Sequence, residues 1–261
     1  MIGKFLSGLA DGFRHQALEV CASTNTECLN AADVGDSGNL WITSKRQTGG
    51  KGSRGRSWTS EPGNLFTSLL LVDPCQPGHL AELTFVAAVA VGDTLNELLP
   101  DLPRKHVGLK WPNDVLVRGR KISGILLEGG TRNTMTHVAI GIGINCKSNP
   151  KDTIYPATCL STEGSGIVPQ DVFDTLAPNM AQILNLWDRG RNFEAVRSRW
   201  LQNAVGIGQE VEVRLEGREP EVGTFDSIDE NGHMVMKTRD GRLNNIAVGD
   251  VFFRGSPELG E

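Results

Sequence analysis

The chain has 261 residues, a formal net charge of −5, 39% hydrophobic residues and 22% charged residues. This composition is typical of a soluble globular protein, and its negative charge argues against a general nucleic-acid binder. The length predicts one large domain and one small domain. The longest apolar run, residues 85–91, is far too short to cross a membrane. Residues 1–10 contain no continuous apolar segment, so we do not expect a signal peptide.

The cysteines and histidines show no pattern of a metal or disulfide site. The five cysteines include no Cys-x-x-Cys pair, which favours reduced thiols in a cytoplasmic protein. The five histidines are scattered, so we expect no structural transition-metal site. The sequence does not exclude a catalytic Cys–His pair, although no motif points to one.

The N-terminal part is expected to contain strands at 18–20, 40–44 and 65–72, the last of them buried on both faces. The spacing of Thr24 and Glu27 fits a capping box and predicts a helix from about residue 24 to 32. Its first turn, at Ser23 and Thr24, either only caps the helix or exposes hydroxyl and N–H groups to a ligand. A long helix over 80–99, ended by Pro100, should cover the sheet.

The next region, 107–145, has the pattern of adjoining hairpins, with strands expected at 107–111, 115–117, 121–128 and 136–145. Because strands outnumber helices, the main sheet should be antiparallel or mixed. Helices are expected at 169–188, where Pro178 would introduce a kink, and at 192–202.

From Val205 onward the pattern changes to short alternating strands, expected at 211–215, 221–225, 234–237 and 245–248. The dipeptides Asn231-Gly232 and Asp240-Gly241 are strong hairpin signals. We therefore expect a larger domain over residues 1–203 and a small barrel-like β domain over residues 204–261.

A glycine-rich basic stretch, residues 47–58, follows the strand expected at 40–44. Four glycines and three cations within ten residues cannot build a core, whereas clustered Lys and Arg supply donors for phosphate or carboxylate. We expect a mobile loop that closes over an anionic substrate, with Trp58 as a stacking surface. Residues 50–55 match the GxGxxG pattern, but no helix follows, so a Rossmann site is not expected. The alternative is a solvated basic loop.

A second motif joins Lys110-Trp111-Pro112-Asn113-Asp114 with Lys121, seven residues further on. Pro112 lacks a backbone N–H and has a fixed φ, so Asn113 and Asp114 should lie at a strand break. There they could serve a magnesium-bound nucleotide or a nucleophile, and Lys121 suits stabilisation of a phosphoryl-type transition state. The alternative is a type I turn with an exposed salt bridge.

Over residues 20–150 the order of these motifs resembles that of biotin protein ligases. The resemblance is carried by five segments: Ser23-Thr24-Asn25, Gln47 with Gly50–Trp58, Lys110–Asp114, Lys121–Leu126 and Gly141–Asn145. It implies a two-step ligase, in which biotin and Mg-ATP form biotinyl-5′-AMP and a carrier-protein lysine then displaces AMP. It also implies an α+β fold, with a catalytic domain similar to class II aminoacyl-tRNA synthetases, a mixed sheet and a small C-terminal SH3-like β domain.

The resemblance assigns site residues by motif position. The catalytic residues would be Lys121, in contact with the biotin carboxylate and bridging phosphate oxygens, Asp114, which orients or deprotonates the incoming lysine, and Arg56, which faces phosphate. The biotin site would comprise Ser23, Thr24, Asn25, Gln47, Gly50, Lys51, Gly52, Ser53, Lys121, Gly124 and Gly141. The ATP site would comprise Ser53, Arg54, Arg56, Trp58, Asn113, Lys121 and Asn145. No fixed metal site is implied, only Mg²⁺ bound with ATP near Asn113.

The loop departs from the family pattern Gly-Arg-Gly-Arg-Arg-Gly-Arg at two positions. Lys51 keeps the charge of the arginine that it replaces but loses the bidentate fork, and Ser53 loses the charge altogether. We therefore expect biotinyl-AMP to be held less tightly, unless Arg54 or another cation substitutes.

The resemblance also implies a partner, a biotin carboxyl carrier domain of acetyl-CoA carboxylase or another biotin-dependent carboxylase, and a cytoplasmic monomer or homodimer. No DNA-binding module precedes the first motif, so we expect no repressor function, no DNA partner and no membrane partner. Two alternatives stay open. A lipoyl or octanoyl ligase or transferase shares the fold, but the Trp-Pro-Asn-Asp and basic-loop motifs argue against it. A non-catalytic biotin-binding or carrier-docking module is disfavoured by Lys121, Asp114 and Arg56.

Overall fold

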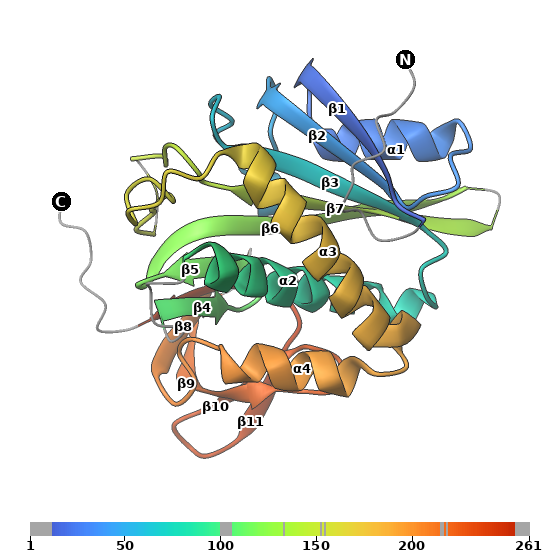
Figure 1. The fold of residues 1–261 in the computed structure, drawn as a ribbon. Helices are drawn as coiled ribbons and strands as arrows, with labels where there is room; N and C mark the ends of the chain where they lie inside the picture. Colours follow the sequence, from blue (N-terminus) through green and yellow to red (C-terminus); the bar gives the residue numbers. More distant parts are fainter. Residues whose placement is uncertain are drawn as a thin grey trace.

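Two β-sheets organise the molecule, which is described here by a computed structural model (Figure 1). The described residues are 12–99, 106–132, 134–151, 153, 155–214, 217 and 219–253. The first sheet has seven strands in the order β1-β2-β3-β7-β6-β5-β4, and the second has five in the order β11-β10-β9-β8-β12. The strands of the first sheet are β1 Arg14–Cys21, β2 Leu40–Gln47, β3 Leu65–Val72, β4 Val107–Lys110, β5 Asp114–Val117, β6 Arg120–Arg132 and β7 Met135–Ile144.

The seven-stranded sheet is mixed, as predicted, because β1 pairs with β2 in parallel and all other neighbours pair antiparallel. Its register places Gly124 of β6 opposite Gly143 of β7. Strand β3 is buried from Leu65 to Leu71, so the prediction of a strand covered on both faces is confirmed.

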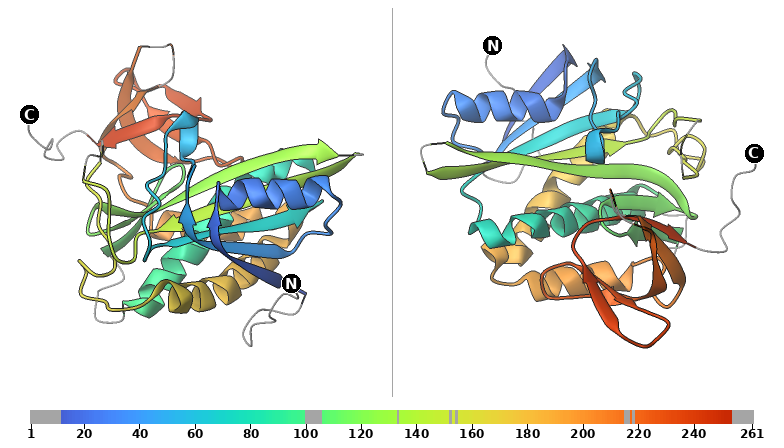
Figure 2. Two further views of the ribbon diagram at one scale, coloured as in Figure 1. Left: turned by 90° about the horizontal axis from the view of Figure 1, so that it is seen from above. Right: turned by 180° about the vertical axis from the view of Figure 1, so that it is seen from behind.

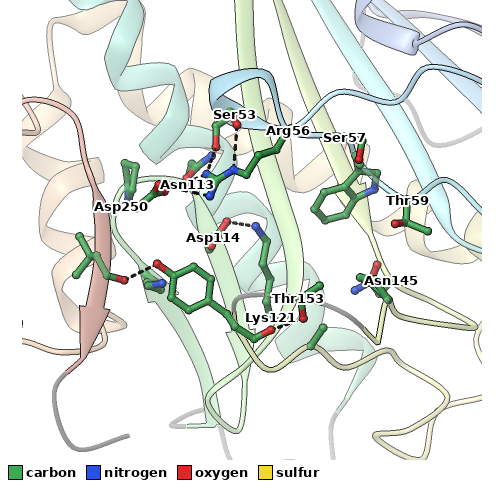
Figure 3. Close-up of a pocket in the computed structure, with 18 of the residues that line it drawn as sticks. Ser53, Arg56, Ser57, Thr59, Asn113, Asp114, Lys121, Asn145, Thr153 and Asp250 are labelled. Atoms are coloured by element: carbon green, nitrogen blue, oxygen red, sulfur yellow. Dashed lines mark hydrogen bonds and ion pairs between the residues drawn. The ribbon is translucent and has the colours of Figure 1, made fainter. Parts of the chain in front are cut away.

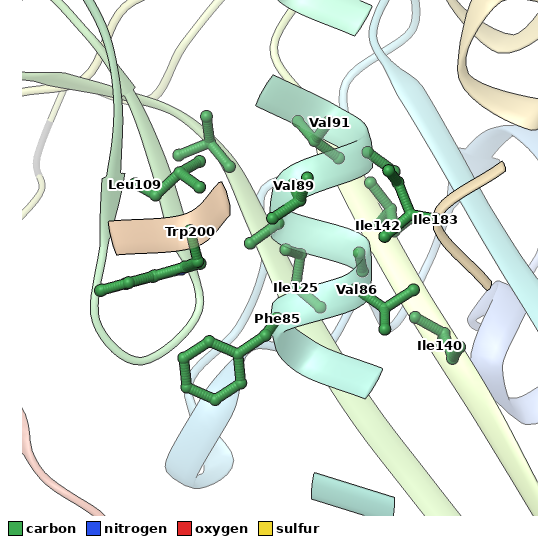
Figure 4. Close-up of a cluster of buried hydrophobic side chains, with 14 of the residues drawn as sticks. Phe85, Val86, Val89, Val91, Leu109, Ile125, Ile140, Ile142, Ile183 and Trp200 are labelled. Carbon is green, nitrogen blue, oxygen red and sulfur yellow. The ribbon is translucent and has the colours of Figure 1, made fainter. Parts of the chain in front are cut away.

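Helices cover the two faces of this sheet unequally (Figure 2). The helices are α1 Thr24–Asp33, α2 Leu83–Leu98, α3 Pro169–Trp187 and α4 Phe193–Gln202. On one face, α2 inserts Val86 and Val89 into a large apolar cluster with Ile125, Ile140 and Ile142 of the sheet (Figure 4). On the other face, α1 forms a separate small cluster through residues such as Cys28 and Ala32.

The second sheet is packed onto the first through the same large apolar cluster, which includes Val211 and Met234. Its strands are β8 Glu210–Arg214, β9 Glu221–Ile228, β10 Met234–Lys237, β11 Leu243–Ile246 and β12 Asp250–Phe253. The indole N–H of Trp111 donates to the carbonyl of Gly232 at 3.0 Å, and Arg197 Nε donates to the carbonyl of Ile228 at 2.7 Å. These contacts fix the position of the second sheet beside β4 and β5.

The second sheet confirms both hairpin signals, because β9 pairs with β10 across Asn231-Gly232 and β10 pairs with β11 across Asp240-Gly241. Strand β12 has no counterpart among the predicted strands. Among the described residues the five strands pair in an open order, with β11 and β12 at the edges, so the pairing does not close a barrel.

Two local expectations need correction. Helix α2 begins at Leu83 rather than near residue 80, because Pro77–Glu82 forms a 3₁₀ turn. Helix α3 continues through Pro178, and a kink at this proline stays a prediction. The capping box is wrong: Ser23 occupies the N-cap position of α1 and makes no side-chain cap bond. Pro100 and residues 1–10 lie outside the described residues.

One segment, Pro77–Leu98, is long and apolar enough to span a membrane by length and composition alone. It includes α2, and 67% of its most apolar 18-residue stretch is buried inside the protein. We therefore assign it as a core helix.

Candidate active site

Two adjoining cavities open at the end of the seven-stranded sheet where β2 and β7 finish and β5 and β6 begin. The large cavity has a volume of about 310 Å³ and the small cavity about 50 Å³. Both are lined by the same five residues at their junction, Gly52, Ser53, Trp58, Asn113 and Lys121. A ligand that spans the two cavities must therefore pass these residues.

The wall of the small cavity contains a network of polar side chains on α1, β2 and β3, which ends at the carboxylate of Glu128 on β6. The Thr24 N–H donates to Gln47 Oε1 at 2.8 Å. Ser68 Oγ lies 2.7 Å from Thr24 Oγ1 and 2.6 Å from Asn25 Oδ1. Asn25 Nδ2 donates to Glu128 Oε2 at 2.9 Å. Because each of these groups is held by a partner on a neighbouring element, the wall is rigid before a ligand arrives.

Glycines on β6 and β7 make room for the side chains above them. A Cβ added to Gly141 would lie 2.4 Å from Asn25 Oδ1. A Cβ at Gly143 or Gly124 would lie 2.6 Å or 2.8 Å from the indole of Trp58. The Trp58 ring therefore lies directly on the backbone of β6 and β7, where it separates the two cavities.

Lys121 and Asp114 form an ion pair at this junction, with 2.6 Å between Lys121 Nζ and Asp114 Oδ1 (Figure 3). Lys121 Nζ also lies 5.4 Å from the centre of the Trp58 ring. Asn113 donates its amide N–H to the carbonyl of Ile125 at 2.7 Å, so its side-chain oxygen is the atom left for a ligand. A cation is thus placed where both cavities meet, next to a carboxylate that can accept a proton.

The glycine-rich loop is tied to the second sheet by Asp250, the first residue of β12. Arg56 Nη2 lies 3.0 Å from Asp250 Oδ1, and Arg54 Nη1 lies 3.0 Å from Asp250 Oδ2. Arg56 also donates to Ser53 Oγ at 2.9 Å (Figure 3). At the other side of the loop, Lys51 Nζ lies 3.0 Å from Glu128 Oε1. All three loop cations are therefore paired with carboxylates.

Comparison with known proteins identifies this arrangement. Residues 18–145 match the biotin/lipoate A/B protein ligase family, and residues 206–254 match the biotin protein ligase C-terminal domain. A relative from Paracoccus denitrificans, named biotin–[acetyl-CoA-carboxylase] ligase, is 36% identical over 242 residues, which is 89% of this chain and 98% of the relative. The chain belongs to the biotin protein ligase family.

Two further relatives agree with this membership in the biotin protein ligases. A Mycobacterium tuberculosis protein with the same name is 31% identical over 94% of this chain and 91% of its own length. The solved structure of the biotin protein ligase from Aquifex aeolicus in complex with biotin and ATP has a TM-score of 0.75 and 27% identity, and the match covers 93% of this chain and 99% of that chain.

Nearly all of the site residues that the family resemblance assigned line one of the two cavities. The small cavity of this biotin protein ligase is lined by Ser23, Thr24, Asn25, Gln47, Lys51, Gly52, Ser53, Lys121, Gly124 and Gly141. The large cavity is lined by Ser53, Arg56, Trp58, Asn113, Asp114, Lys121 and Asn145. These are the residues expected for biotin and for ATP with catalysis, respectively.

Two assigned residues line neither cavity. Arg54 is directed to Asp250 and to the carbonyl of Arg214, 3.3 Å away. It therefore does not supply the charge that Ser53 lacks. Gly50 lies within the loop, where a Cβ would be 2.4 Å from Ser60 Oγ, so it allows a close approach of the loop to itself.

The sequence reasoning gave no role to three residues of the large cavity: Lys110, Tyr155 and Asp250. Lys110 is only 5% exposed, and burial lowers the pKa of its amine from 10.5 to about 8. Its Nζ lies 3.3 Å from the centre of the Tyr155 ring, and the Tyr155 hydroxyl donates to the carbonyl of Val251 at 2.9 Å. The position of Lys110 next to Trp111 and Pro112 in the second motif could have indicated that Lys110 belongs to the site. No sequence pattern indicated Asp250, because the strand that carries it was not predicted.

Among the described residues, no group of three or more His, Cys, Asp or Glu side chains could hold a metal ion. The oxygen atoms of the large cavity come instead from single residues such as Asn113, Asp114 and Asp250. Such a site suits Mg²⁺ that arrives with the phosphates of a nucleotide, because this ion is usually bound by one or two protein oxygens together with substrate phosphates.

Proposed function

We propose that this protein activates biotin with ATP as biotinyl-5′-AMP, releasing pyrophosphate, and then transfers the biotinyl group to a lysine of a biotin carboxyl carrier domain, releasing AMP. The named relatives and the Aquifex structure with biotin and ATP support this function. The observation that carries it is the junction at Trp58 and Lys121, where a small cavity with a mostly neutral polar wall meets a large cavity with more charged side chains. An acyl group in the first and a nucleotide in the second would react beside Lys121.

The polar groups that line the small cavity match biotin in their chemistry. Its ureido ring carries two N–H donors and one carbonyl acceptor, and the wall offers hydroxyl and amide groups of Ser23, Thr24, Asn25 and Gln47. The neutral wall suits an uncharged ring system, and the biotin carboxylate would then point to Lys121.

In the first step, a carboxylate oxygen of biotin attacks the α-phosphorus of ATP and pyrophosphate leaves. Lys121 would neutralise charge on the carboxylate and on the bridging oxygens as the new bond forms. Arg56 would contact phosphate, Trp58 would pack near adenine, and Asn145 would contact the nucleotide. Asn113 would place its side-chain oxygen near the Mg²⁺ that accompanies ATP.

In the second step, the amine of the carrier lysine attacks the acyl carbonyl, the acyl–phosphate bond breaks, and AMP leaves. The amine must lose a proton, and Asp114 is the carboxylate nearest to Lys121. We assign to Asp114 the role of orienting this amine or accepting its proton.

The proposal extends to the organisation of the chain. Residues 1–203 would form the catalytic domain, related to class II aminoacyl-tRNA synthetases, and residues 204–261 an SH3-like domain that completes the large cavity through Asp250. The enzyme would act in the cytoplasm, as a monomer or a homodimer, without a DNA or membrane partner.

One assay tests the function against its alternatives. Pyrophosphate exchange into ATP is measured with biotin, lipoate or octanoate as the acid, and a carrier domain is then probed with streptavidin. We expect exchange with biotin alone, and label on the carrier but not on a carrier whose acceptor lysine is arginine. Exchange with lipoate or octanoate would indicate the related ligases. Biotin binding without exchange would indicate a non-catalytic module and refute the proposal.

A further inference from the structure

Glu163 is a carboxylate without exposure to solvent in the segment between β7 and α3. Its side chain is 0% exposed and lines neither cavity. Glu163 Oε1 accepts hydrogen bonds from Arg120 Nη2 at 2.7 Å and from Thr158 Oγ1 at 2.6 Å. Arg118 Nη1 lies 3.6 Å from Glu163 Oε2. The carboxylate is therefore hydrogen-bonded through Oε1 to one guanidinium group and one hydroxyl group, and the guanidinium of Arg118 forms a longer ion pair with Oε2, which has no hydrogen-bond partner among the described residues.

The partners of Glu163 carry two residues of the large cavity. Thr158 donates its backbone N–H to the carbonyl of Lys121 at 2.9 Å and accepts the amide N–H of Asn145 at its own carbonyl at 3.0 Å. Lys121 donates its N–H to the carbonyl of Pro156 at 2.7 Å. Lys121 and Asn145 are thus both bonded to Thr158, in addition to the backbone bond from the Asn145 N–H to the carbonyl of Ile122 at 2.9 Å.

Glu163 bonds both to Arg120, which precedes Lys121, and to Thr158, which bonds to Lys121 and Asn145. Arg120 directly precedes Lys121 at the start of β6, and Thr158 follows Ala157, which forms an isolated β-bridge with Lys121. The segment around Thr158 is held by this bridge and by single backbone bonds, such as Leu160 N–H to the carbonyl of Asn145 at 3.0 Å, and not by a continuous ladder or helix. The side-chain bonds of Glu163 therefore add to its stability. A buried carboxylate with paired partners is costly to disrupt, since loss of one partner leaves a charge uncompensated.

We propose that Glu163 is a positioning residue for adenylate formation, which fixes Lys121 relative to Asn145 by holding Arg120 and Thr158 together. The kinetic part of this inference rests on the proposed function, whereas its structural part does not. Misplacement of a catalytic group by about 1 Å can cost about 10²-fold in rate. A residue that touches no substrate can therefore control the first step.

Two variants test the inference, with a matched control. Glu163→Gln keeps the shape and removes the charge, and Thr158→Val removes only the hydroxyl. The control is Glu82→Gln. Glu82 is also a buried carboxylate, 5% exposed, that accepts the Trp187 indole N–H at 2.6 Å and lies 2.7 Å from His79 Nδ1, but it lines neither cavity.

We expect Glu163→Gln to lower kcat/KM for ATP about 10- to 100-fold in biotin-dependent pyrophosphate exchange. Biotin affinity, measured by calorimetry, should stay within about threefold. Thr158→Val should give a smaller loss of the same kind, and the double variant should be no worse than Glu163→Gln, because both act through one connection. Glu82→Gln should lower thermal stability and leave kcat/KM unchanged.

A second readout needs no activity. Amide hydrogen exchange of residues 120–124, 157 and 158 should accelerate at least tenfold in Glu163→Gln and not in Glu82→Gln. Equal exchange in both variants would overturn the structural part. Unchanged kcat/KM for ATP with accelerated exchange would overturn the kinetic part. Absence of any biotin-dependent exchange in the unmodified protein would refute the proposed function instead, and the amide exchange would still decide whether Glu163 fixes Lys121.

Discussion

The two cavities are built in different ways. The small cavity is formed mainly by neighbouring elements of one sheet and the start of α1, and its polar side chains are mostly neutral and bonded to one another, with Lys51 and Lys121 at its edge toward the loop and the junction. The large cavity combines the sheet, the glycine-rich loop, the segment around Tyr155 and strand β12 of the second sheet. Its wall carries three basic side chains, Lys110, Lys121 and Arg56.

This difference has a physical consequence for ligand binding. A mostly neutral wall with satisfied hydrogen bonds can be complete before the ligand arrives, so its shape decides what fits. The wall of the large cavity is built from distant parts of the chain, and its charged side chains form ion pairs with one another, such as Arg56–Asp250 and Lys121–Asp114. Phosphates must compete with these carboxylates or extend the pairs. We therefore expect binding in the small cavity to depend on packing and binding in the large cavity to depend on charge.

The largest effect is expected at the junction. Lys121→Ala should lower the rate of biotin-dependent pyrophosphate exchange about 10²- to 10⁴-fold, because it removes the cation that both cavities share. The thermal midpoint should fall by only a few degrees, since the lysine side chain is 26% exposed and its loss leaves only the Asp114 carboxylate without its partner. Lys45→Ala removes an exposed lysine paired with Glu19 outside the cavities and serves as the control. Near-normal exchange or an unfolded variant would contradict the role of Lys121.

A glycine substitution tests the role of packing in the small cavity. Gly141→Ala places a Cβ 2.4 Å from Asn25 Oδ1 and forces Asn25 away from Ser68. Disrupted buried hydrogen bonds cost about 1–3 kcal/mol, so biotin affinity should fall about 10- to 100-fold while ATP affinity changes little. Gly166→Ala is the control, because nothing lies within 4 Å of its Cβ. Equal losses of biotin and ATP affinity would show that the two cavities are not independent.

Lys110 tests the role of charge in the large cavity. Lys110→Met removes a buried cation, so KM for ATP should rise about tenfold while the protein becomes more stable. Because burial lowers the pKa of Lys110 from 10.5 to about 8, its charge opposes folding by at most about 3 kcal/mol below pH 8.

The sign of this effect gives a pH dependence. Between pH 8 and 10.5 the unfolded chain binds the proton and the folded chain does not, so stability rises with pH across this range. Chemical denaturation at several pH values should show Lys110→Met as the more stable protein below pH 8 and the two proteins as equal above pH 10.5. A stability difference that does not change with pH would contradict the buried charge.

Asp250 tests the connection between the loop and the second sheet. Asp250→Asn should accelerate trypsin cleavage after Lys51, Arg54 and Arg56 about 3- to 10-fold in the ligand-free protein. Both ion pairs are partly exposed, and such pairs stabilise by about 0.5–1 kcal/mol each. Glu210→Gln removes a pair with Arg239 on the same sheet without contact to the loop. Equal cleavage of Asp250→Asn and Glu210→Gln would show that Asp250 does not hold the loop.

The smallest effect is expected at Ser53, where the loop departs from its family. Arg54 lines neither cavity and is bound to Asp250, so it does not replace the charge missing at Ser53. Ser53→Arg adds a fork-shaped donor at the junction and should slow release of biotinyl-AMP about threefold or more. Release is measured by chase of labelled intermediate, with Lys51→Arg as the variant that keeps the charge. Equal release rates in Ser53→Arg and the unmodified protein would reject the hypothesis.

Local patterns in the sequence were sufficient for much of the fold. The apolar run of β3 and the turn dipeptides Asn231-Gly232 and Asp240-Gly241 act over a few residues, and the structure confirms the strand and both hairpins. The capping box failed because Thr24 is engaged by Gln47 and Ser68, which are distant in sequence.

In the candidate site, too, local contacts were easier to predict than distant ones. Most residues that the motif positions assign to biotin line the small cavity, because the pairing of neighbouring strands brings them together. They did not predict the direction of Arg54, the burial of Lys110 or the arrival of Asp250. Each of these depends on how the second sheet packs against the first, and no local pattern encodes that packing.

The position of Trp58 on Gly124 and Gly143 gives the protein an optical reporter. The other four tryptophans are 2% exposed or less: Trp41, Trp111, Trp187 and Trp200. Trp58 alone is partly exposed and separates the two cavities, so ligand-induced changes in tryptophan emission should come chiefly from its indole. Filling of the small cavity and of the large cavity would then be separable in time by stopped-flow fluorescence, with Trp58→Phe as the silent form.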